Sequence, residues 1–587
     1  MSDTTPHIPM RRKHLGYHLD LALLALILSG FVLVAAQRLA SVPLPETDEA
    51  YTLQVPYEML VHGKLALPML RYLGGDIENH WHSYTPVYFV ILGGFLKLTG
   101  WGLLQGRIFN LITAVLLLLM VYALGRRLLD WRVGLMATLL LLSDITFIER
   151  SRMLRNDYLA AFFAMLGFYL YEVGRRRRQA RYYLASGLAV GCGVMCHTNI
   201  LYMICAIGLL ILLDQGWRAF RKRPLYAFAG GALAVMAYEI VYDLIDYKNY
   251  LLQNRQDKLH FMLFEPGGLW QNFVGEAARY RAWYTARSQY AGTHYGLIFQ
   301  SLPHTLSHVF QLLTAAAIIY LLWVCARRIR QKQAMSDYRV HLLIVTVVTV
   351  LFHAIITGHK EIYYMAHLAP WFALAAAVML KDAYDRMGGL RLRSWREARL
   401  VYKTATVAML IAGLAFGVML VRLYKKYGEG LRNPGLVTFA EYETTLRELI
   451  PDELCPVVRK ISPAVWLAFP EKDACFADIE NRVRKAVDID GKDYALLTPD
   501  VWPEYHLLGE LKDTAYGPSI YIYYTGSDPR FSSLPSRRYR FFNWQRGHVE
   551  EPLVPPTVER KTSPAAPVPT NGHRAEPLSP RGSRRAG

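Results

Sequence analysis

Apolar runs separated by short polar segments dominate the chain up to about residue 425. A helix of about 20 apolar residues crosses the hydrocarbon core of a bilayer. With their flanks, these runs therefore predict about eleven membrane-spanning helices in a polytopic, all-α membrane protein. The predicted spans lie near residues 20–40, 104–124, 133–149, 157–174, 182–198, 199–214, 224–244, 305–325, 338–356, 364–380 and 402–422.

One further apolar run, "PVYFVILGGFLKL" at residues 86–98, is short for a crossing. Counting it as a span would move Arg126 and Arg127 to the outer side and disturb the alternation of the later helices. We therefore expect a juxtamembrane or re-entrant helix at 86–98. In the alternative, this run spans the membrane and a later helix does not. The run at 20–40 lacks a small-residue cleavage site, which indicates a retained helix.

The composition agrees with a membrane protein, since 53% of the 587 residues are hydrophobic and only 19% are charged. The net charge of +19 includes short basic clusters between the apolar runs, such as 11–13, 175–178 and 391–399. Such clusters are typical of cytoplasmic loops, and no basic stripe lies on a soluble domain, so the charge argues against nucleic acid as a partner. Placing these clusters inside gives a cytoplasmic N-terminus at 1–19 and a spanning region at 20–423.

From residue 424 to 549 we expect a small extracytoplasmic α+β domain. The segment "FAEYETTLRELI" predicts an amphipathic helix, and "PAVWLAF", "DYALLTPDVW" and "SIYIYYTG" predict short strands. The tail at 550–587, rich in Pro, Ser, Gly and Arg, is predicted to be disordered. Cys455 and Cys475 are disulfide candidates in this domain, whereas the four cysteines in apolar segments fit packing roles.

This topology gathers the polar residues suited to chemistry on the outer side of the membrane. Asp48 and Glu49 follow almost directly on the first predicted span. In one interpretation they mark a helix end in the headgroup region. In the other they are functional, because the amphipathic stretch at 51–65 would hold both acids at the membrane surface. His80 and His82 form an H-x-H pair that can bind a divalent metal ion, although aromatic residues are also expected in this interfacial region.

The segment "ERSRMLRNDY" at 149–158 is the basic cluster that this topology places outside. Because it breaks the usual orientation rule, a functional reason for it is favoured. The guanidinium groups of Arg152 and Arg155 suit a phosphate headgroup. They are also placed to pair with Glu149 and Asp157, and both interpretations can hold together.

A second polar turn, "GHKEIYYMAHLAP", opens a later apolar helix. Lys360 is a further candidate phosphate contact there, with Tyr363 beside it. The long outer loop at 245–304 interleaves basic and aromatic residues, among them Arg279. A mobile loop that covers a lipid-linked substrate is expected to have this composition.

Three stretches together resemble the GT-C glycosyltransferases, in particular bacterial relatives of the protein O-mannosyltransferases and of the aminoarabinose transferase that acts on lipid A. They are "DEAYTLQVPYEMLVHGKL" at 48–65, the region from "LLQGRIFN" to "NDYLAAFFAML" at 103–166, and "GHKEIYYMAHLAPWFALAAA" at 358–377. Many relatives carry Lys-Pro-Pro or His-Pro-Pro before the helix at 86, whereas this chain has "HSYTPVYF" and no lysine. That departure leaves open whether His82 or Tyr84 takes the place of this phosphate contact.

The resemblance implies a GT-C fold and the inverting transfer of a sugar from a polyprenyl-phosphate donor to an acceptor hydroxyl on a glycolipid, a lipid A-like molecule or a protein. It implies a bacterial inner-membrane enzyme whose active site faces the periplasm or cell exterior. The roles it suggests are a base at Asp48, with Glu49 supporting it or acting instead, and a holding or binding role for Asp157. The phosphate contacts it suggests are Arg152, Arg155, Lys360 and Tyr363.

Two other classes of protein remain open on the sequence alone. A transporter or flippase of lipid-linked sugars would use the same outer acids, but it predicts polar residues near the bilayer midplane and repeated halves. The sequence has no convincing internal repeat, and its polar residues cluster at one face. A structural protein that binds envelope partners through its C-terminal domain is the third class.

Overall fold

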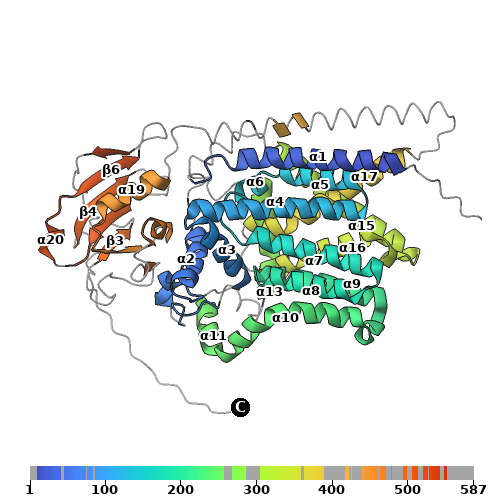
Figure 1. The fold of residues 1–587 in the computed structure, drawn as a ribbon, viewed down its shortest axis with the longest axis horizontal. Coiled ribbons are helices and arrows are strands. Elements are labelled where there is room, and N and C mark those ends of the chain that lie inside the picture. The colour runs from blue at the N-terminus through green and yellow to red at the C-terminus, as the bar shows by residue number, and fades with distance from the viewer. Residues whose placement is uncertain are drawn as a thin grey trace, which may run out of the picture. The chain divides into compact units, whose positions relative to one another are not determined.

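The structure is a computed structural model in which the described residues fall into a helical membrane region and a C-terminal sheet (Figure 1). The described residues are 10–40, 45, 47–73, 76–82, 86–256, 267–285, 305–357, 362–388, 417–418, 420–421, 425, 439–458, 463–470, 477–478, 494–498, 505–512, 520–526, 528–541 and 548–551. The chain divides into two compact units, Met1–Glu551 and Pro552–Gly587. The predicted disordered tail lies outside the described residues, and the predicted boundary at 424 stays a prediction.

The membrane region consists of helices. They are α1 Met10–Ala35, α2 Thr47–Val61, α3 Pro86–Thr99, α4 Leu103–Leu128, α5 Trp131–Leu142, α6 Ile145–Arg150, α7 Asp157–Arg177, α8 Ala180–Val194, α9 Leu201–Gln215, α10 Arg223–Ile245, α11 Tyr247–Gln256, α13 Gly268–Thr285, α15 Thr305–Arg330, α16 Tyr338–Ile355 and α17 Met365–Gly388, with the 3₁₀ helices η1 Pro68–Leu73, η2 Thr198–Ile200, η3 Gly216–Arg221, η5 Ala334–Ser336 and η6 Ile362–Tyr364.

Within the described residues, six helices are long and apolar enough to cross a membrane. They are Leu103–Leu128, Thr198–Arg221, Arg223–Ile245, His308–Arg330, Tyr338–Ile355 and Ile362–Arg386. Shorter apolar helices lie at Leu19–Ala35, Pro86–Thr99 and Trp131–Leu142. The helical membrane class predicted from the sequence is therefore confirmed, while the count of eleven spans is not established. The predicted span at 402–422 lies almost entirely outside the described residues.

Two predicted segments can be compared with the helix bounds. The predicted span at 133–149 is interrupted, because α5 ends at Leu142 and the side chain of Asp144 caps the next helix, α6. The 14 residues of α3 extend about 21 Å, which is shorter than the roughly 30 Å hydrocarbon core. That length agrees with the juxtamembrane assignment of 86–98.

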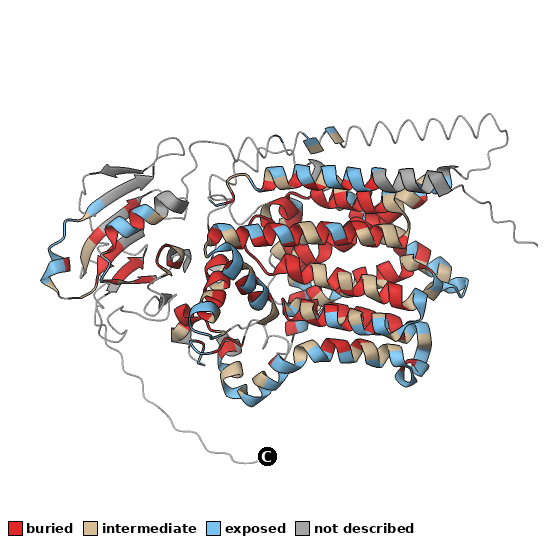
Figure 2. Cartoon of the chain, viewed as in Figure 1, coloured by how far each residue is buried: buried red, intermediate tan, exposed pale blue. Residues whose placement is uncertain are grey.

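Helices α4, α7, α8 and α10 lie side by side in this order (Figure 1). Glycines allow close packing between α8 and α10: a Cβ added to Gly187 would lie 2.0 Å from Phe228 O, and one added to Gly231 would lie 2.3 Å from Leu184 O. Small residues are typical of contacts between membrane helices because they let the backbones approach. Buried residues gather between the helices, and exposed residues follow α1 and α10 (Figure 2). The exposed residues of α10 include Leu233, Val241 and Leu244, as expected for a lipid-facing surface.

The C-terminal part is an α+β unit, as predicted. Its seven strands form one mixed sheet in the order β2-β1-β3-β5-β4-β6-β7. The elements are α19 Phe439–Leu449, η7 Pro463–Ala468, α20 Pro529–Ser532, β1 Cys455–Val458, β2 Ala477–Asp478, β3 Tyr494–Thr498, β4 His506–Lys512, β5 Ile520–Tyr524, β6 Arg537–Phe541 and β7 His548–Glu551.

The predicted helix and two of the three predicted strands in this unit are confirmed as α19, β3 and β5. The predicted strand "PAVWLAF" is wrong, because this segment forms the 3₁₀ helix η7. Its leading proline fixes φ near −65°, an angle that is compatible with a tight helical turn. The side chain of Trp466, which lies in this turn, is buried. Cys455 is disulfide-bonded, and its predicted partner Cys475 lies outside the described residues.

Candidate active site

The two adjacent acids at the start of α2 have opposite environments. The side chain of Glu49 is 1% exposed, and Arg107 donates two hydrogen bonds to it at 2.8 and 2.7 Å. The backbone N–H of Leu154 donates a third, at 2.8 Å. Glu49 therefore joins α2, α4 and the turn before α7 through a buried ion pair.

Asp48 is placed differently, because its side chain is 37% exposed. Its carboxylate pairs with Nη1 of Arg155. Nε of the same guanidinium donates to Asp157 Oδ2 at 2.7 Å. One arginine thus joins the accessible acid of α2 to the buried acid that begins α7, so two of the predicted catalytic acids meet at one cation.

An aromatic side chain more than 200 positions further along the sequence, Tyr363, completes this contact. The guanidinium carbon of Arg155 lies 3.6 Å from the ring centroid of Tyr363 in η6. The guanidinium carbon of Arg150 lies 5.5 Å from the same centroid. Both distances are within the range of cation–π attraction. Tyr363 therefore lies beside two of the guanidinium groups of the segment 149–158.

Histidines that the sequence-based site did not include surround Asp157. His367 Nε2 lies 3.3 Å from Asp157 Oδ1, and His197 Nε2 lies 3.7 Å from it. The ring of His353 is 5.5 Å from that of His367. The three histidines lie near the ends of η2, α16 and α17, and a polar residue at the end of an apolar helix was the available sequence signal.

Arg152 and Lys360 are the two other predicted phosphate contacts. The guanidinium group of Arg152 is buried and donates to backbone carbonyls of Ala35 and Gln37, where α1 ends. Arginine is well suited to such unsatisfied carbonyls at a helix C-terminus. Lys360 lies outside the described residues. Of the predicted phosphate contacts, Arg155 and Tyr363 are thus the ones that the structure brings to Asp48.

The predicted histidine pair lies among carboxylates. His82 Nδ1 is 2.8 Å from Asp243 Oδ1, and His82 Nε2 is 3.0 Å from Asp246 Oδ2. Burial lowers the pKa of His82, but these two carboxylates outweigh burial and raise it above its usual value. Burial, aided by the charge of His82, lowers the pKa of His80 to about 4.

These contacts also test the fit of a metal ion. Both ring nitrogens of His82 already face carboxylates, so His80 and His82 do not fit a two-histidine metal site in this arrangement. Among the side chains that the structure describes, no group of three or more His, Cys, Asp and Glu residues is arranged to hold a metal ion. We therefore assign no chemical step to a metal.

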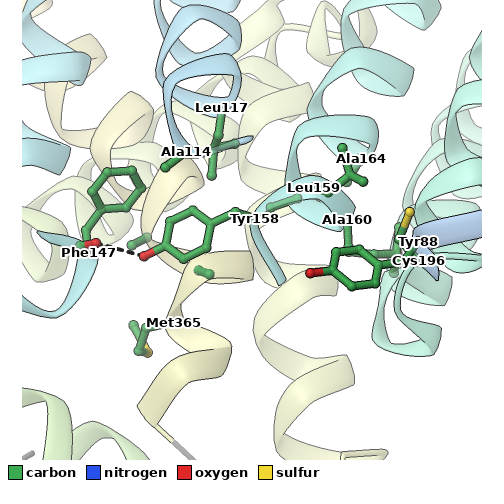
Figure 3. Packing of buried hydrophobic residues seen from close by; sticks show 14 of the residues in the cluster. Tyr88, Ala114, Leu117, Phe147, Tyr158, Leu159, Ala160, Ala164, Cys196 and Met365 are labelled. Carbon is green, nitrogen blue, oxygen red and sulfur yellow. Dashed lines mark hydrogen bonds between the residues drawn. The ribbon is translucent and has the colours of Figure 1, made fainter. Parts of the chain in front are cut away.

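A small cavity of about 10 Å³ lies beside the Arg155–Tyr363 contact. Figure 3 labels three of its lining residues, Phe147, Tyr158 and Met365, and shows Tyr158 bonded to Phe147 O. Asp144, Arg150 and Tyr363 also line it, and its volume is that of about one water molecule. Burial raises the pKa of Asp144 to about 6, against hydrogen bonds from Trp283 and Thr146 that favour the ionised form.

The long apolar helices and a charged site built where separate helices begin and end are those of a polytopic helical membrane protein. Residues 83–242 match the family model described as dolichyl-phosphate-mannose-protein mannosyltransferase. The match includes Arg155 and Asp157 and excludes Asp48 and Tyr363. No curated protein matches the sequence.

Solved structures extend the fold likeness to most of the chain. ArnT from Cupriavidus metallidurans in the apo state has a TM-score of 0.53 at 13% identity, over 87% of this chain and 98% of that one. The same protein bound to undecaprenyl phosphate has a TM-score of 0.51 at 14% identity, over 86% and 97%. The apo oligosaccharyltransferase from Archaeoglobus fulgidus has a TM-score of 0.47 at 15% identity, over 78% of this chain, which spans 64% of that protein's length. At 13–14% identity, the two ArnT structures show that this chain shares their GT-C fold.

Proposed function

We propose that this protein transfers a sugar, with inversion, from a polyprenyl-phosphate donor to an acceptor hydroxyl at the outer face of a bacterial inner membrane. The observation that carries the proposal is the partly exposed Asp48, joined through Arg155 to the buried Asp157. The family description names a dolichyl-phosphate sugar donor, and one structural neighbour was solved with undecaprenyl phosphate. Both support a lipid phosphate as the sugar carrier.

Asp48 is the proposed general base. The acceptor oxygen attacks the anomeric carbon while Asp48 takes the hydroxyl proton, and the bond between that carbon and the phosphate oxygen breaks. The polyprenyl phosphate leaves with the electron pair of that bond. A single displacement on the face opposite the leaving group inverts the anomeric centre and needs no covalent sugar–enzyme intermediate.

Arg155 has two tasks in this scheme. It orients Asp48 from the side of Asp157, and its charge lies where negative charge develops on the departing phosphate. Tyr363, stacked on its guanidinium group, restricts the rotation of Arg155. Lys360, three positions before Tyr363, stays a proposed second phosphate contact.

Glu49 and Arg152 are not given chemical steps in this scheme. Glu49 is buried against Arg107, and removing it from that pair would leave a buried guanidinium group without its partner. Arg152 is engaged by carbonyls at the end of α1. We propose that both support the site by fixing α1, α2 and α4 around it.

The proposed orientation places the acceptor outside the cytoplasm. Arg126, Arg175 and Arg327 lie in the last turns of α4, α7 and α15, which fits cytoplasmic ends for these helices. The disulfide at Cys455 supports an oxidising compartment for the C-terminal unit. A glycolipid, a lipid A-like molecule or a protein in that compartment is the proposed acceptor.

The test is transfer by the purified protein in lipid nanodiscs, from a panel of undecaprenyl-phosphate pentoses and hexoses to membrane extracts. We expect Asp48→Asn to lower kcat by roughly 10²–10⁴-fold, because the amide cannot accept the proton. Asp385→Asn is the matched control, since Asp385 is 52% exposed and pairs with Lys381 on its own helix. It should retain the wild-type rate.

Two outcomes contradict the proposal. Wild-type protein that transfers no sugar from any donor would remove the transferase activity, and an unchanged rate in Asp48→Asn would remove the base. The rival class, a flippase, predicts movement of a labelled lipid-linked sugar across liposomes without transfer. Movement that persists when Asp48 is replaced, with no glycosylated product, would favour that rival.

A further inference from the structure

A buried hydrogen bond joins the turn between α5 and α6 to the outer helix α13. Trp283 Nε1 donates to Asp144 Oδ2 at 3.1 Å, and the two residues are 139 positions apart. Asp144 is 1% exposed and Trp283 is 5% exposed. The other carboxylate oxygen of Asp144 accepts from the N–H of Thr146 at 3.1 Å and caps α6.

These two hydrogen bonds explain why the residue at position 144 is an aspartate and not another helix-capping residue. Serine, threonine or asparagine would cap α6 as well as aspartate does. The carboxylate differs because it offers two acceptor oxygens, one for Thr146 N and one for the indole of Trp283. An asparagine has a single acceptor oxygen, so it would leave one of the two donors facing an amide NH₂ group.

The indole of Trp283 is also held by two membrane helices. Its ring centroid lies 5.9 Å from that of Phe310 in α15 and 5.9 Å from that of Phe372 in α17. The backbone carbonyl of Trp283 accepts a hydrogen bond from Gln311 Nε2 at 2.9 Å. The C-terminal turn of α13 is therefore fixed from three directions. Of the contacts made by the Trp283 side chain described here, the hydrogen bond to Asp144 is the polar one.

The same face of α13 leads to the proposed site. Arg279, one turn before Trp283, is 0% exposed, and its guanidinium carbon lies 5.7 Å from the ring centroid of Tyr364. The rings of Tyr364 and Tyr363 are 5.3 Å apart, and Tyr363 stacks on Arg155. Contacts thus run from Arg279 through the tyrosine pair to Arg155, the cation that holds Asp48, and one turn of α13 connects Arg279 to Trp283.

A second route from Asp144 passes through the small cavity. Asp144, Arg150 and Tyr363 line it together, so one side of the carboxyl group faces the turn that carries the guanidinium groups. The position of Asp144 is therefore coupled to Tyr363 both directly, across the cavity, and through α13.

We propose that Asp144 is a positioning residue which, through Trp283, seats α13 against the outer face so that Arg279 and Tyr364 shape the binding site for the lipid-phosphate sugar. The inference rests on the proposed transferase function. It deepens that function, because it assigns donor binding to a contact remote from the reacting atoms.

The first arm of the test is kinetic. Trp283→Phe keeps the ring and removes the donor, and Asp144→Asn loses the same bond while keeping the cap of α6. A hydrogen bond to a buried charged group corresponds to about a tenfold or larger effect, so we expect both variants to raise the donor KM by about 10-fold. The kcat and the acceptor KM should stay within about twofold of wild type, because the reacting groups are unchanged.

The second arm needs no activity. We expect amide hydrogen exchange in the peptide 268–285 to be faster in Trp283→Phe and Asp144→Asn, measured by mass spectrometry on the full chain in nanodiscs. Trp270→Phe is the matched control, because Trp270 lies on the same helix and is 67% exposed. It should leave both exchange and donor KM at wild-type values.

The two arms separate the possible failures. Unchanged exchange in Trp283→Phe and Asp144→Asn overturns the seating of α13, whatever the activity. Faster exchange with an unchanged donor KM, or a loss of kcat alone, overturns the positioning role and leaves a purely structural contact. If wild-type protein transfers nothing, the proposed function fails. The affinities of wild type and Trp283→Phe for undecaprenyl phosphate then decide whether the Asp144–Trp283 contact supports the binding of a lipid phosphate.

Discussion

Asp48 and Glu49 show how one residue step changes the role of a carboxylate. Consecutive helical residues point about 100° apart, so one acid faces the buried Arg107 and the other the accessible side. The sequence left open which of the two acts as base. We propose Asp48, because a base must reach the acceptor's proton and Glu49 already receives three hydrogen bonds.

Replacing Arg107 by methionine tests this division. Removing one partner of a buried pair leaves a charge without compensation, so we expect Arg107→Met to lower the free energy of unfolding by about 3–5 kcal/mol. Thermal unfolding in detergent measures the loss, and activity per folded molecule should change far less than in Asp48→Asn. Arg447→Met is the control, because its pair with Glu443 is exposed and contributes at most about 1 kcal/mol. Wild-type stability in Arg107→Met would argue against a structural role for Glu49.

His82 predicts a dependence of stability on pH. Both its ring nitrogens face carboxylates, and an imidazolium ion can donate to both whereas a neutral ring cannot. The other titratable groups around it are His80 and Asp76 on its own loop, Glu239, Tyr242 and Asp243 on α10, Asp246 after α10, and Tyr250 on α11.

Because the folded-state pKa of His82 is raised, its stabilisation is complete below the unfolded pKa of 6.5 and is lost as pH rises through the folded value. We expect wild-type protein to lose on the order of 2 kcal/mol more than His82→Gln as pH rises above 6.5. Melting temperatures across this range measure the difference. His62→Gln, at a half-exposed histidine, should follow the wild-type curve, and parallel curves for wild type and His82→Gln would refute the ion-pair interpretation.

At the scale of elements, the spacing of α8 and α10 depends on glycines. Gly231 offers the sharpest test, because its neighbour Gly230 has open space where a Cβ would lie. We expect Gly231→Ala to lower stability by about 1–3 kcal/mol, since the new methyl group meets Leu184 O. Gly230→Ala should be neutral or stabilise the helix by up to about 1 kcal/mol. Thermal unfolding of the two variants compares them directly, and equal melting temperatures would rule out the close contact as a determinant.

At the scale of the whole molecule, the proposed site is assembled from segments far apart in the sequence. The start of α2, the turn before α7, α13 and η6 supply Asp48, Arg155, Arg279 and Tyr363. The start of α2, the turn before α7 and η6 are ends of helices or connections between helices, whereas α13 is a helix that is not among the six candidate spans. In the proposed site, the long apolar helices therefore act as the rigid frame, while the segments between and beside them supply the proposed reacting groups.

The sequence by itself determined the membrane class, most helix positions, the α+β class of the C-terminal unit and the candidacy of Asp48, Arg155 and Asp157. These features follow from local patterns, because apolar length decides membrane insertion and basic clusters decide orientation. A short apolar run bounded by proline predicts a strand at "PAVWLAF" as well, but the structure has the 3₁₀ helix η7 there.

Only the tertiary structure decided which partner each polar side chain takes. Arg107 is paired with Glu49, 58 positions away, and Trp283 donates a hydrogen bond to Asp144, 139 positions away. The tertiary structure also turned the predicted phosphate contact Arg152 toward the end of α1. A charged group taken out of water binds whichever compensating group the packing of helices brings within reach, and that choice depends on contacts between distant parts of the chain that no local pattern encodes.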